Sequence, residues 1–366
     1  MAHSDDYFMQ QALTLAQQGV YTTMPNPRVG SVVVRDGVIV GRGAHLRAGE
    51  PHAEVHALRE AGDLAKGADV YVTLEPCSHQ GRTPPCADAL IASGVKRVIV
   101  AMQDPNPKVA GNGLAKLTAA GIEVTTGLME QEARALNPGF ISRMTRGIPY
   151  VRSKIAASLD GRTALANGVS KWITGEAARQ DVQAWRARSC AIMTGVCTVL
   201  LDDPQMQVRR EDLVALLAGR QPLRVVVDSR LRTPLNATIL HGGGTLVAYA
   251  EDPEGKVSML EAAGVSTICL PNASGRVDLQ RLLQHLATLE INEVLVEAGP
   301  GLNGALQEAS LIDAYLFYYA PVLMGNDARG MLAMPGFTDM SQRIALDIQE
   351  VSMIGEDIRI QATIRR

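Results

Sequence analysis

Segments with the periodicity of β-strands alternate with segments of helical periodicity along most of this sequence. In the first part, apolar runs at 32–34, 70–74 and 98–100 predict strands, and helical patterns follow Pro51 and Pro85. A chain that alternates in this way can bury its apolar faces by packing helices on a sheet. We therefore expect an α/β fold.

Asp36-Gly37 lies between two apolar runs, at 32–34 and 38–40. A type I′ turn requires positive φ at both of its central residues, and Asp-Gly is a preferred pair for it. The sequence therefore predicts a β-hairpin at this point of the sheet.

The alternation is interrupted between Asn137 and Pro149, where proline, glycine and basic residues gather. A chain of 366 residues is long enough for two domains. We place the boundary in this stretch, which gives domains at 1–147 and 148–366. In the second domain we expect strands at 150–156, 191–195, 224–228, 245–249 and 293–296, and helices at 176–188 and 279–289.

The first 18 residues favour an amphipathic helix, in which Phe8, Ala12, Leu13, Leu15 and Ala16 share a buried face. They lack the basic stretch, apolar core and cleavage site of a secretory signal. No run of about 18 apolar residues occurs in the sequence, so we expect a cytoplasmic protein with no membrane partner. Thiols stay reduced in the cytoplasm, and the five cysteines are therefore expected to be ligands, nucleophiles or core residues.

The net charge of −3 and the isoelectric point near 6.2 describe a slightly acidic chain. Such a charge gives no broad attraction to nucleic acid or to anionic membranes. We therefore expect a small-molecule substrate and no nucleic-acid partner.

Three residues of the first domain, His52, Cys77 and Cys86, have the chemistry of zinc ligands. An open catalytic zinc site takes three protein ligands and leaves one position for water. A proline precedes both His52 and Cys86, which indicates helix starts, and the positive end of a helix favours a thiolate. We expect these residues to hold Zn²⁺, and Glu54 to be the catalytic residue that handles the protons of the bound water.

The same residues resemble the H-x-E and P-C-x-x-C signature of zinc-dependent nucleobase deaminases, which is carried here by His52-Ala53-Glu54 and Pro76-Cys77. Eight residues separate the two cysteines in place of the usual two. This long loop ends in Thr-Pro-Pro-Cys and resembles the deaminase domain of a bifunctional family of riboflavin biosynthesis enzymes. The resemblance implies a cytidine-deaminase-like α/β/α domain.

The predicted deaminase site also has candidate substrate contacts. The resemblance suggests that Asn26 contacts the pyrimidine, because an amide can both donate and accept along a base edge. The inserted loop brings His79 and Arg82 beside the metal, where they could meet a sugar phosphate.

Other interpretations of the cysteine pair stay open. The cysteines could form a structural zinc knuckle in a binding protein without turnover, which chelation would unfold. His56 lies one helical turn after His52 and could pair with it in a different metal site, or belong to the core. Spacing alone gives His45 no role.

A glycine-rich turn follows the strand expected at 293–296 and opens a helix. Residues Gly299 to Gly304 satisfy G-x-G-x-x-G, a spacing that can present backbone amides to a pyrophosphate. No acidic residue ends the next apolar run, at 316–323, so the Rossmann fingerprint for NAD is incomplete. Taken alone, the turn indicates either a phosphate site or a tight strand-to-helix connection.

The segment from Lys154 to Thr163 resembles the opening of the reductase domain of the same riboflavin family, which has a dihydrofolate-reductase-like α/β fold. Further similar segments follow in family order, at Ser170–Thr174, Arg186, Gly195–Pro204, Val227–Ser229 and the turn after Glu297. With the first domain, the resemblance covers nearly the whole chain. It implies NADPH as the cofactor and a homo-oligomer, either a dimer or a tetramer.

The resemblance also implies roles for the residues at matching positions. NADPH would lie along Ala156, Trp172, Thr198, Asp202, Ser229, Gly299, Pro300, Gly301, Leu302, Asn303, Gly304 and Ala305. The ribose phosphate would meet Ser170, Arg186, Met206 and Arg209, and Lys154 and Glu297 would position the sugar and exchange protons with it. Guanidinium groups suit phosphate oxygens, although each arginine alone would be interpreted as a solvated charge.

Together the two halves imply a bifunctional enzyme of riboflavin biosynthesis. The first domain would hydrolytically remove an amino group from 2,5-diamino-6-ribosylamino-4(3H)-pyrimidinone 5′-phosphate. The second would use NADPH to reduce the ribosyl group to ribityl. The alternative is a nucleoside or tRNA deaminase with an accessory domain, against which the acidic isoelectric point and the reductase-like second half both count.

Overall fold

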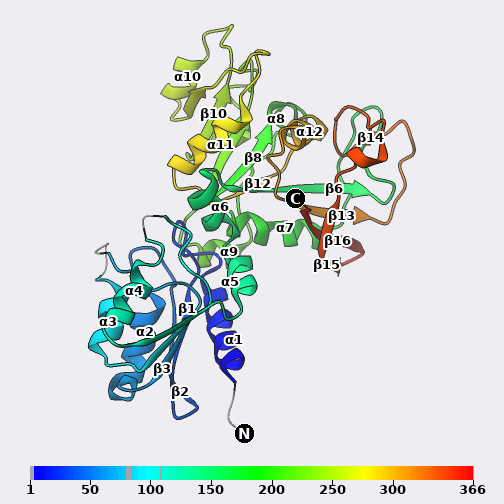
Figure 1. Cartoon of the computed structure of the whole chain (residues 1–366). Coiled ribbons are helices and arrows are strands. Elements are labelled where there is room, and N and C mark those ends of the chain that lie inside the picture. The colour runs from blue at the N-terminus through cyan, green and yellow to red at the C-terminus, as the bar shows by residue number, and fades with distance from the viewer. Residues whose placement is uncertain (1–3, 80–83, 108, 366) are drawn as a thin grey trace. The chain divides into compact units, whose positions relative to one another are not determined.

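The chain divides into two compact units, Met1–Ile148 and Pro149–Arg366, one residue later than the boundary placed from the sequence. The computed structural model describes residues 4–79, 84–107 and 109–365. Figure 1 shows that each unit contains its own sheet with helices packed on it. Both units therefore have the α/β architecture that the alternating pattern predicts.

The first unit is built on a five-stranded sheet in the order β2-β1-β3-β4-β5. Its strands are β1 (Gly30–Arg35), β2 (Val38–Ala44), β3 (Asp69–Val72), β4 (Arg97–Val100) and β5 (Glu123–Thr126). β1 is antiparallel to β2 and β3, whereas β3, β4 and β5 run parallel. The carboxyl ends of these three parallel strands therefore lie at one edge of the sheet.

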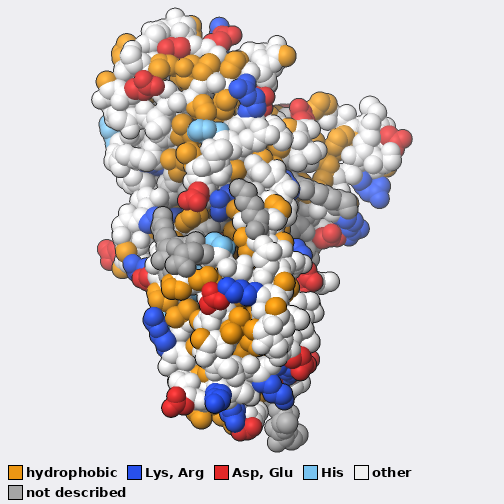
Figure 2. Space-filling model, turned by 60° about the vertical axis from the view of Figure 1, so that its left-hand side comes forward, with side chains coloured by type: hydrophobic (Ala, Val, Ile, Leu, Met, Phe, Trp, Pro, Cys, Tyr) orange, Lys and Arg blue, Asp and Glu red, His pale blue; other side chains and the backbone are white. Residues whose placement is uncertain are grey.

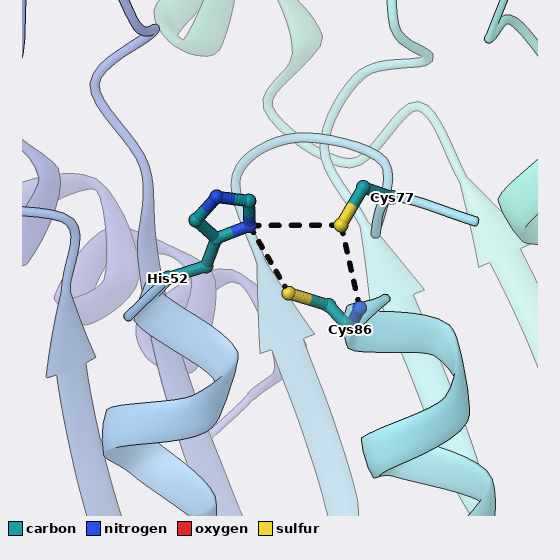
Figure 3. A group of neighbouring side chains, drawn as sticks. All are labelled: His52, Cys77 and Cys86. Carbon is teal, nitrogen blue, oxygen red and sulfur yellow. Dashed lines mark hydrogen bonds between the residues drawn. The ribbon is translucent and has the colours of Figure 1, made fainter. Parts of the chain in front are cut away.

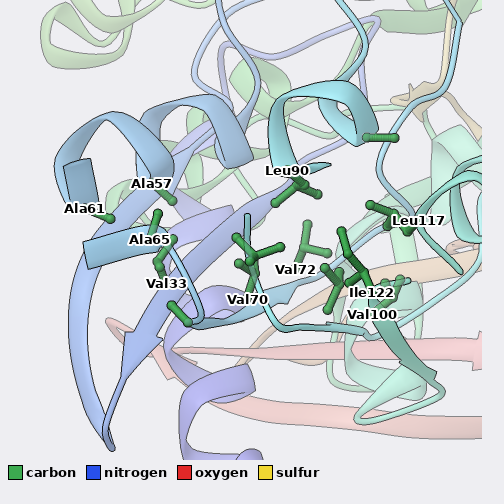
Figure 4. Close-up of a cluster of buried hydrophobic side chains, with 14 residues drawn as sticks. Val33, Ala57, Ala61, Ala65, Val70, Val72, Leu90, Val100, Leu117 and Ile122 are labelled. Atoms are coloured by element: carbon green, nitrogen blue, oxygen red, sulfur yellow. The ribbon is translucent and has the colours of Figure 1, made fainter. Parts of the chain in front are cut away.

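Helices cover both faces of this sheet. They are α1 (Asp5–Ala16), α2 (Ala53–Ala61), α3 (Cys86–Ala92), α4 (Asn112–Ala119), α5 (Glu130–Leu136) and α6 (Pro138–Arg146), with short 3-10 helices at Gln17–Gly19 and Gly62–Ala65. On one face, Ala57, Leu90 and Leu117 pack into the core that Figure 4 shows. On the other, Phe8 packs against Tyr71. The result is the expected α/β/α layering.

Two local predictions for the first unit are confirmed. Asp36 and Gly37 have φ of 51° and 78°, and they join β1 to β2 as the I′ turn requires. The residues expected on the buried face of α1 are buried, except Leu15, which is partly exposed.

The interrupted stretch before the boundary is largely helical, which its sequence pattern does not predict. Pro138 occupies the first turn of α6, where its missing N–H is not needed, and Gly147 ends the helix at φ 69°. The proline and glycine that suggest a linker are therefore the two ends of a helix.

The second unit contains a nine-stranded sheet in the order β11-β10-β9-β8-β12-β6-β13-β16-β15. Its strands are β6 (Tyr150–Ser158), β8 (Ala191–Gly195), β9 (Leu223–Val227), β10 (Thr245–Tyr249), β11 (Ser266–Cys269), β12 (Glu293–Val296), β13 (Ala314–Ala320), β15 (Leu346–Ile354) and β16 (Asp357–Ile364), and β7 (Arg162–Ala164) pairs separately with β14 (Arg329–Gly330). Seven neighbouring strands, from β11 to β13, run parallel, and β16 and β15 complete the sheet in antiparallel fashion.

The helices of the second unit are α7 (Glu176–Arg188), α8 (Val196–Asp202), α9 (Glu211–Leu216), α10 (Val257–Ala262), α11 (Leu279–Thr288) and α12 (Pro300–Glu308), with 3-10 helices at Thr238–Leu240 and Met340–Gln342. β12 is late in the sequence but lies between β6 and β8. Such a reversal of strand order opens a crevice at the carboxyl ends of parallel strands, where α/β sheets bind ligands.

The surface carries charges of both signs. Figure 2 shows Lys and Arg side chains interspersed with Asp and Glu side chains over the face it presents. Within the described ranges, no helix is long and apolar enough to cross a membrane.

Candidate active sites

His52, Cys77 and Cys86 meet at the carboxyl edge of the first sheet, as Figure 3 shows. His52 is the N-cap of α2, Cys86 is the first residue of α3, and Cys77 follows β3. The Nδ1 atom of His52 lies 3.2 Å from Cys86 Sγ and 3.6 Å from Cys77 Sγ. The spacing-based prediction that these three residues come together is geometrically satisfied.

The three side chains fit a zinc ion. With Zn–N near 2.0 Å and Zn–S near 2.3 Å, tetrahedral coordination places a nitrogen and a sulfur ligand about 3.5 Å apart. The two observed nitrogen–sulfur distances, 3.2 and 3.6 Å, bracket that value. In the described part of the chain the cluster offers three ligand atoms, the number found in open catalytic sites.

The surroundings of Cys77 favour the ionised form of its thiol, which is the form that binds a metal. The backbone N–H of Cys86, at the start of α3, donates to Cys77 Sγ at 3.3 Å. The pKa of the Cys77 thiol is lowered to about 4, first by a hydrogen bond from the Cys86 side chain and then by the His52 imidazole, although burial opposes the change. The Cys77 thiol therefore loses its proton more readily than an isolated cysteine does, as a metal ligand requires.

Glu54 lies in the first turn of α2, and its side chain is buried beside the cluster. Burial raises the pKa of this carboxyl group to about 7, and the charge of His52 and a hydrogen bond from Cys86 oppose part of the rise. A carboxylate without its usual water shell is a stronger base than an exposed one. Glu54 is thus placed beside the ligands without being required as one of them.

Glu75 fixes the strand end that carries Cys77, and no sequence motif predicts this role. Its buried carboxylate accepts backbone hydrogen bonds from Asp104, Gly111 and Gly113 at 3.1, 3.0 and 2.9 Å. These bonds hold the start of α4 against the strand. The backbones are so close that a Cβ atom on Gly113 would lie 1.9 Å from the carbonyl oxygen of Pro76.

Two more residues join the site. Asn26 Nδ2 lies 3.1 Å from His45 Nε2, and the ring of His45 stands edge-on to His52 with centroids 5.2 Å apart. Spacing alone gives His45 no role, whereas the structure brings it beside the cluster.

Two other candidates of the first unit, His56 and His79, do not join the cluster. His56 lies against Gly43 of β2. His79 is exposed, and Arg82 lies outside the described residues.

In the second unit, a cavity of about 1460 Å³ follows the carboxyl edge of the parallel strands. Most residues expected at the reductase site line it, namely Lys154, Ala156, Ser170, Trp172, Arg186, Thr198, Asp202, Met206, Arg209, Ser229, Glu297, Gly299, Pro300, Gly301, Leu302 and Ala305. The structure therefore gathers residues that are dispersed over some 150 positions of the sequence.

The glycine turn divides into a part that faces the cavity and a part that faces the core. A Cβ atom on Gly299 or Gly301 would meet no atom within 4 Å, so both positions leave room beside the start of α12. This room and the amides of the helix start fit the phosphates of a dinucleotide.

Asn303 and Gly304 are not among the residues that line the cavity. The buried Asn303 pairs with the Ser153 hydroxyl at 2.9 Å and donates to the Ala298 carbonyl at 2.9 Å. Gly304 lies so near Ala333 that a Cβ atom would be 2.1 Å from its carbonyl oxygen. Asn303 and Gly304 are therefore not at the cofactor as expected, but pack behind the glycine turn and support it.

Arg186 and Glu297, whose side chains are 11% and 9% exposed, form a two-bond ion pair at the cavity floor. Arg186 Nε and Nη2 donate to the two carboxylate oxygens at 2.6 and 3.1 Å, and Nη1 donates to the carbonyl of Gln207 at 3.0 Å. The guanidinium of Arg186 is therefore already bonded to Glu297 and Gln207, and a substrate phosphate would have to compete with these acceptors for it. Because the two residues are 111 positions apart, no sequence spacing predicts this pair.

The ion pair sets the charge state around Lys154. Burial alone would raise the pKa of Glu297, but the charge and hydrogen bonds of Arg186, together with the charges of Lys154 and Arg209, outweigh burial and the pKa is lowered. Burial lowers the pKa of the Lys154 ammonium, with Glu297 opposing that change. The floor thus combines a fixed carboxylate with a lysine that gives up its proton more readily than an exposed one.

The remaining expected phosphate contacts lie near the same floor. Met206 is buried, has φ of 50°, and places its sulfur 3.7 Å from Arg186 Nη2. Arg209 is exposed and lines an adjoining hollow of about 490 Å³, together with Arg179 and Lys154. Arg209 therefore has the more accessible guanidinium for an incoming phosphate.

Comparisons with known proteins decide the family. A model of the cytidine and deoxycytidylate deaminase zinc-binding region matches residues 2–102, and a model of the RibD C-terminal domain matches residues 149–360. The riboflavin biosynthesis protein RibD of Escherichia coli K12 is 51% identical over 362 residues, covering 97% of this chain and 98% of that protein. The chain belongs to the RibD family.

Solved structures agree with this assignment along the whole chain. Acinetobacter baumannii RibD, form 2, matches with a TM-score of 0.90 and 46% identity over 99% of both chains. A Thermotoga maritima diaminohydroxyphosphoribosylaminopyrimidine deaminase/5-amino-6-(5-phosphoribosylamino)uracil reductase matches with a TM-score of 0.84 and 33% identity over 98% of both chains.

Family membership confirms the function expected from the sequence. The chain is a bifunctional enzyme of riboflavin biosynthesis with a zinc-binding deaminase domain and an NADPH-dependent reductase domain. The alternative, a nucleoside or tRNA deaminase with an accessory domain, is wrong because the second half is this reductase domain.

Proposed function

We propose that the two sites act in turn on one compound. The first removes an amino group from 2,5-diamino-6-ribosylamino-4(3H)-pyrimidinone 5′-phosphate, and the second reduces the ribosyl group of the product to ribityl with NADPH. The observation that carries this proposal is the three-ligand cluster of His52, Cys77 and Cys86 beside the buried Glu54. Three ligands leave a coordination position where chemistry can occur.

In the deaminase site, His52, Cys77 and Cys86 would hold the zinc ion, which when bound makes a water molecule nucleophilic near neutral pH. Glu54 takes a proton from that water and returns it to the departing amino group, which leaves as ammonia. Asn26 contacts the edge of the pyrimidine, and His79 and Arg82 meet the sugar phosphate.

In the reductase site, NADPH supplies the reducing equivalents, and the protein supplies alignment and protons. NADPH would lie along the cavity wall with Gly299 and Gly301 at its phosphates. Lys154 donates a proton to the opened ribosyl imine as its C1′ carbon is reduced. Glu297 binds the sugar, and Arg186 holds Glu297 in place through two bonds.

The substrate phosphate would lie at the mouth of the reductase cavity. Arg209 and Ser170 are its proposed contacts, with Met206 supporting the loop by packing. An exposed guanidinium can reorient onto phosphate oxygens without losing an existing protein partner. Arg209 therefore binds the entering phosphate, whereas Arg186 positions Glu297.

We also propose that the chain acts in the cytoplasm as a dimer or tetramer. Ile348, Val351 and Met353 lie on one face of the edge strand β15 and are 64, 60 and 64% exposed. An exposed apolar row on an edge strand favours association, and this face supports an assembly through the second unit.

The proposed sequence of reactions is tested with the purified full chain and the phosphorylated diaminopyrimidine. We expect ammonia release without NADPH, and consumption of about one NADPH per ammonia once NADPH is added. The unphosphorylated substrate serves as the control, and it should be used poorly at both sites. NADPH oxidation that precedes ammonia release, or equal turnover of cytidine, would contradict the proposal.

A further inference from the structure

The reductase cavity continues well beyond the residues proposed to handle the sugar. It runs from Lys154 on β6 to the loops that follow β9, β10 and β11. Those loops are three to five strands away from β6 in the sheet, which corresponds to roughly 14 to 24 Å at the usual strand spacing. An extended dinucleotide with its nicotinamide beside Lys154 therefore has its adenosine end among these loops.

This far end of the cavity is positively charged. Arg230, Arg232 and Arg276 line it, and Glu251 is the acidic residue among the lining residues of the same three loops. Among the lining residues of these three loops, three positive charges therefore stand against one negative charge, and the nearby Asp203 carboxylate is already bonded by Thr238 of the β9 loop. Such a site attracts a group with about two negative charges.

The three arginines differ in their availability. Arg230 pairs with Glu251, with Nε 3.5 Å from Oε2. Arg232 Nη2 lies 3.8 Å from the sulfur of Cys197, which lines the cavity. Arg276 is exposed and uses its backbone N–H to bond the Asn272 side chain at 3.0 Å. Arg232 and Arg276 therefore offer guanidinium groups without a carboxylate partner among the described residues.

The loops that carry these two arginines are tied together. The backbone N–H of Val277 donates to the hydroxyl of Ser229 at 3.1 Å, which joins the β11 loop to the β9 loop. Both residues also line the cavity. Arg232 lies three positions after Ser229, and Arg276 directly precedes Val277. The contact therefore holds both arginines at the same end of the cavity.

We propose that Arg232 and Arg276 bind the 2′-phosphate of NADPH and thereby make the reductase domain select NADPH over NADH. The two cofactors differ in this phosphate, which carries close to two negative charges near neutral pH. Arginine pairs with phosphate oxygens through charge-assisted hydrogen bonds. The inference rests on the proposed placement of the nicotinamide beside Lys154 and Glu297.

The test measures the Kd of NADPH, NADH and adenosine 2′,5′-bisphosphate for the full chain by calorimetry, without turnover. In Arg232→Ala and Arg276→Ala, we expect the Kd of NADPH and of the bisphosphate to rise roughly 10- to 100-fold. The Kd of NADH should change less than about twofold, because NADH lacks the phosphate. Arg281→Ala is the matched control, since this arginine is exposed on the adjacent α11 and is not among the residues lining the cavity.

The outcomes separate this inference from the function on which it rests. If the two variants weaken NADPH and NADH equally, or leave their ratio unchanged, the 2′-phosphate assignment is overturned. If the unaltered chain binds neither cofactor, the proposed reductase site itself fails. A loss of NADPH affinity alone, with Arg281→Ala unchanged, supports the assignment.

Discussion

In a Glu54→Gln variant, ammonia release from the diaminopyrimidine phosphate is expected to fall by about 10³-fold or more. Glutamine keeps the size of the buried side chain and can still form a hydrogen bond, but it cannot take a proton. Because Glu54 lies beside His52, Cys77 and Cys86 without being required as a ligand, the zinc content should be unchanged. The measurement combines steady-state ammonia release with metal analysis of the same sample.

Glu60→Gln provides the matched control for this variant. Glu60 lies on the same helix, α2, with its side chain half-exposed 3.9 Å from Arg42. Exposed pairs of this kind contribute little to stability, so deamination should change less than about twofold in this control. A Glu54→Gln variant that retains full deamination would contradict the role of Glu54 as the proton carrier.

The second large effect is expected from Lys154→Met. Reduction of the deaminated intermediate should fall by about 10²- to 10⁴-fold, because methionine fills the buried volume and has no proton to donate. Deamination by the same variant, measured separately on the diaminopyrimidine phosphate, serves as the internal control and should be unchanged, since the two sites are built in different units. The measurement is NADPH consumption with the deaminated intermediate as substrate.

The pH profile distinguishes proton donation from a structural role. If Lys154 donates a proton, the reduction rate falls as pH rises through its pKa and the ammonium is lost. Burial lowers that pKa, so the fall should begin below the ordinary lysine value of about 10.4. In Lys154→Met this limb of the profile should disappear. A variant that is slow at all pH values but keeps the limb would contradict proton donation.

Local sequence signals predicted much of the first unit because its key features are local. The Asp36-Gly37 turn and the helix starts at His52 and Cys86 each depend on a few adjacent residues. In the second unit, the C-terminal hairpin of β15 and β16 escaped prediction. A bulge between Ile348 and Glu350 shifts the alternation of apolar residues halfway along β15, so its sequence lacks a continuous period of two.

The ligands and the cavity-lining residues were predictable, whereas the residues that hold them were not. Arg186 and Glu297 lie 111 positions apart in the sequence and meet only through the fold. Glu75 reaches the amide of Asp104, 29 positions away, and amides at the start of α4, 36 and 38 positions away. A motif records which side chains touch the reacting groups, but it does not record tertiary contacts that orient them. The same limit explains why Asn303 and Gly304 were expected at the cofactor, although they support the turn from behind.

The metal stoichiometry of the purified full chain tests the three-ligand centre most directly. We predict about one zinc ion per chain in the unaltered protein, as a single three-ligand site requires, and loss of that zinc in Cys77→Ser and Cys86→Ser. The control is Cys190→Ser, because Cys190 is buried in the second unit and should leave zinc binding intact. A chain that deaminates its substrate without zinc, or that keeps stoichiometric zinc after both ligand substitutions, would contradict the account.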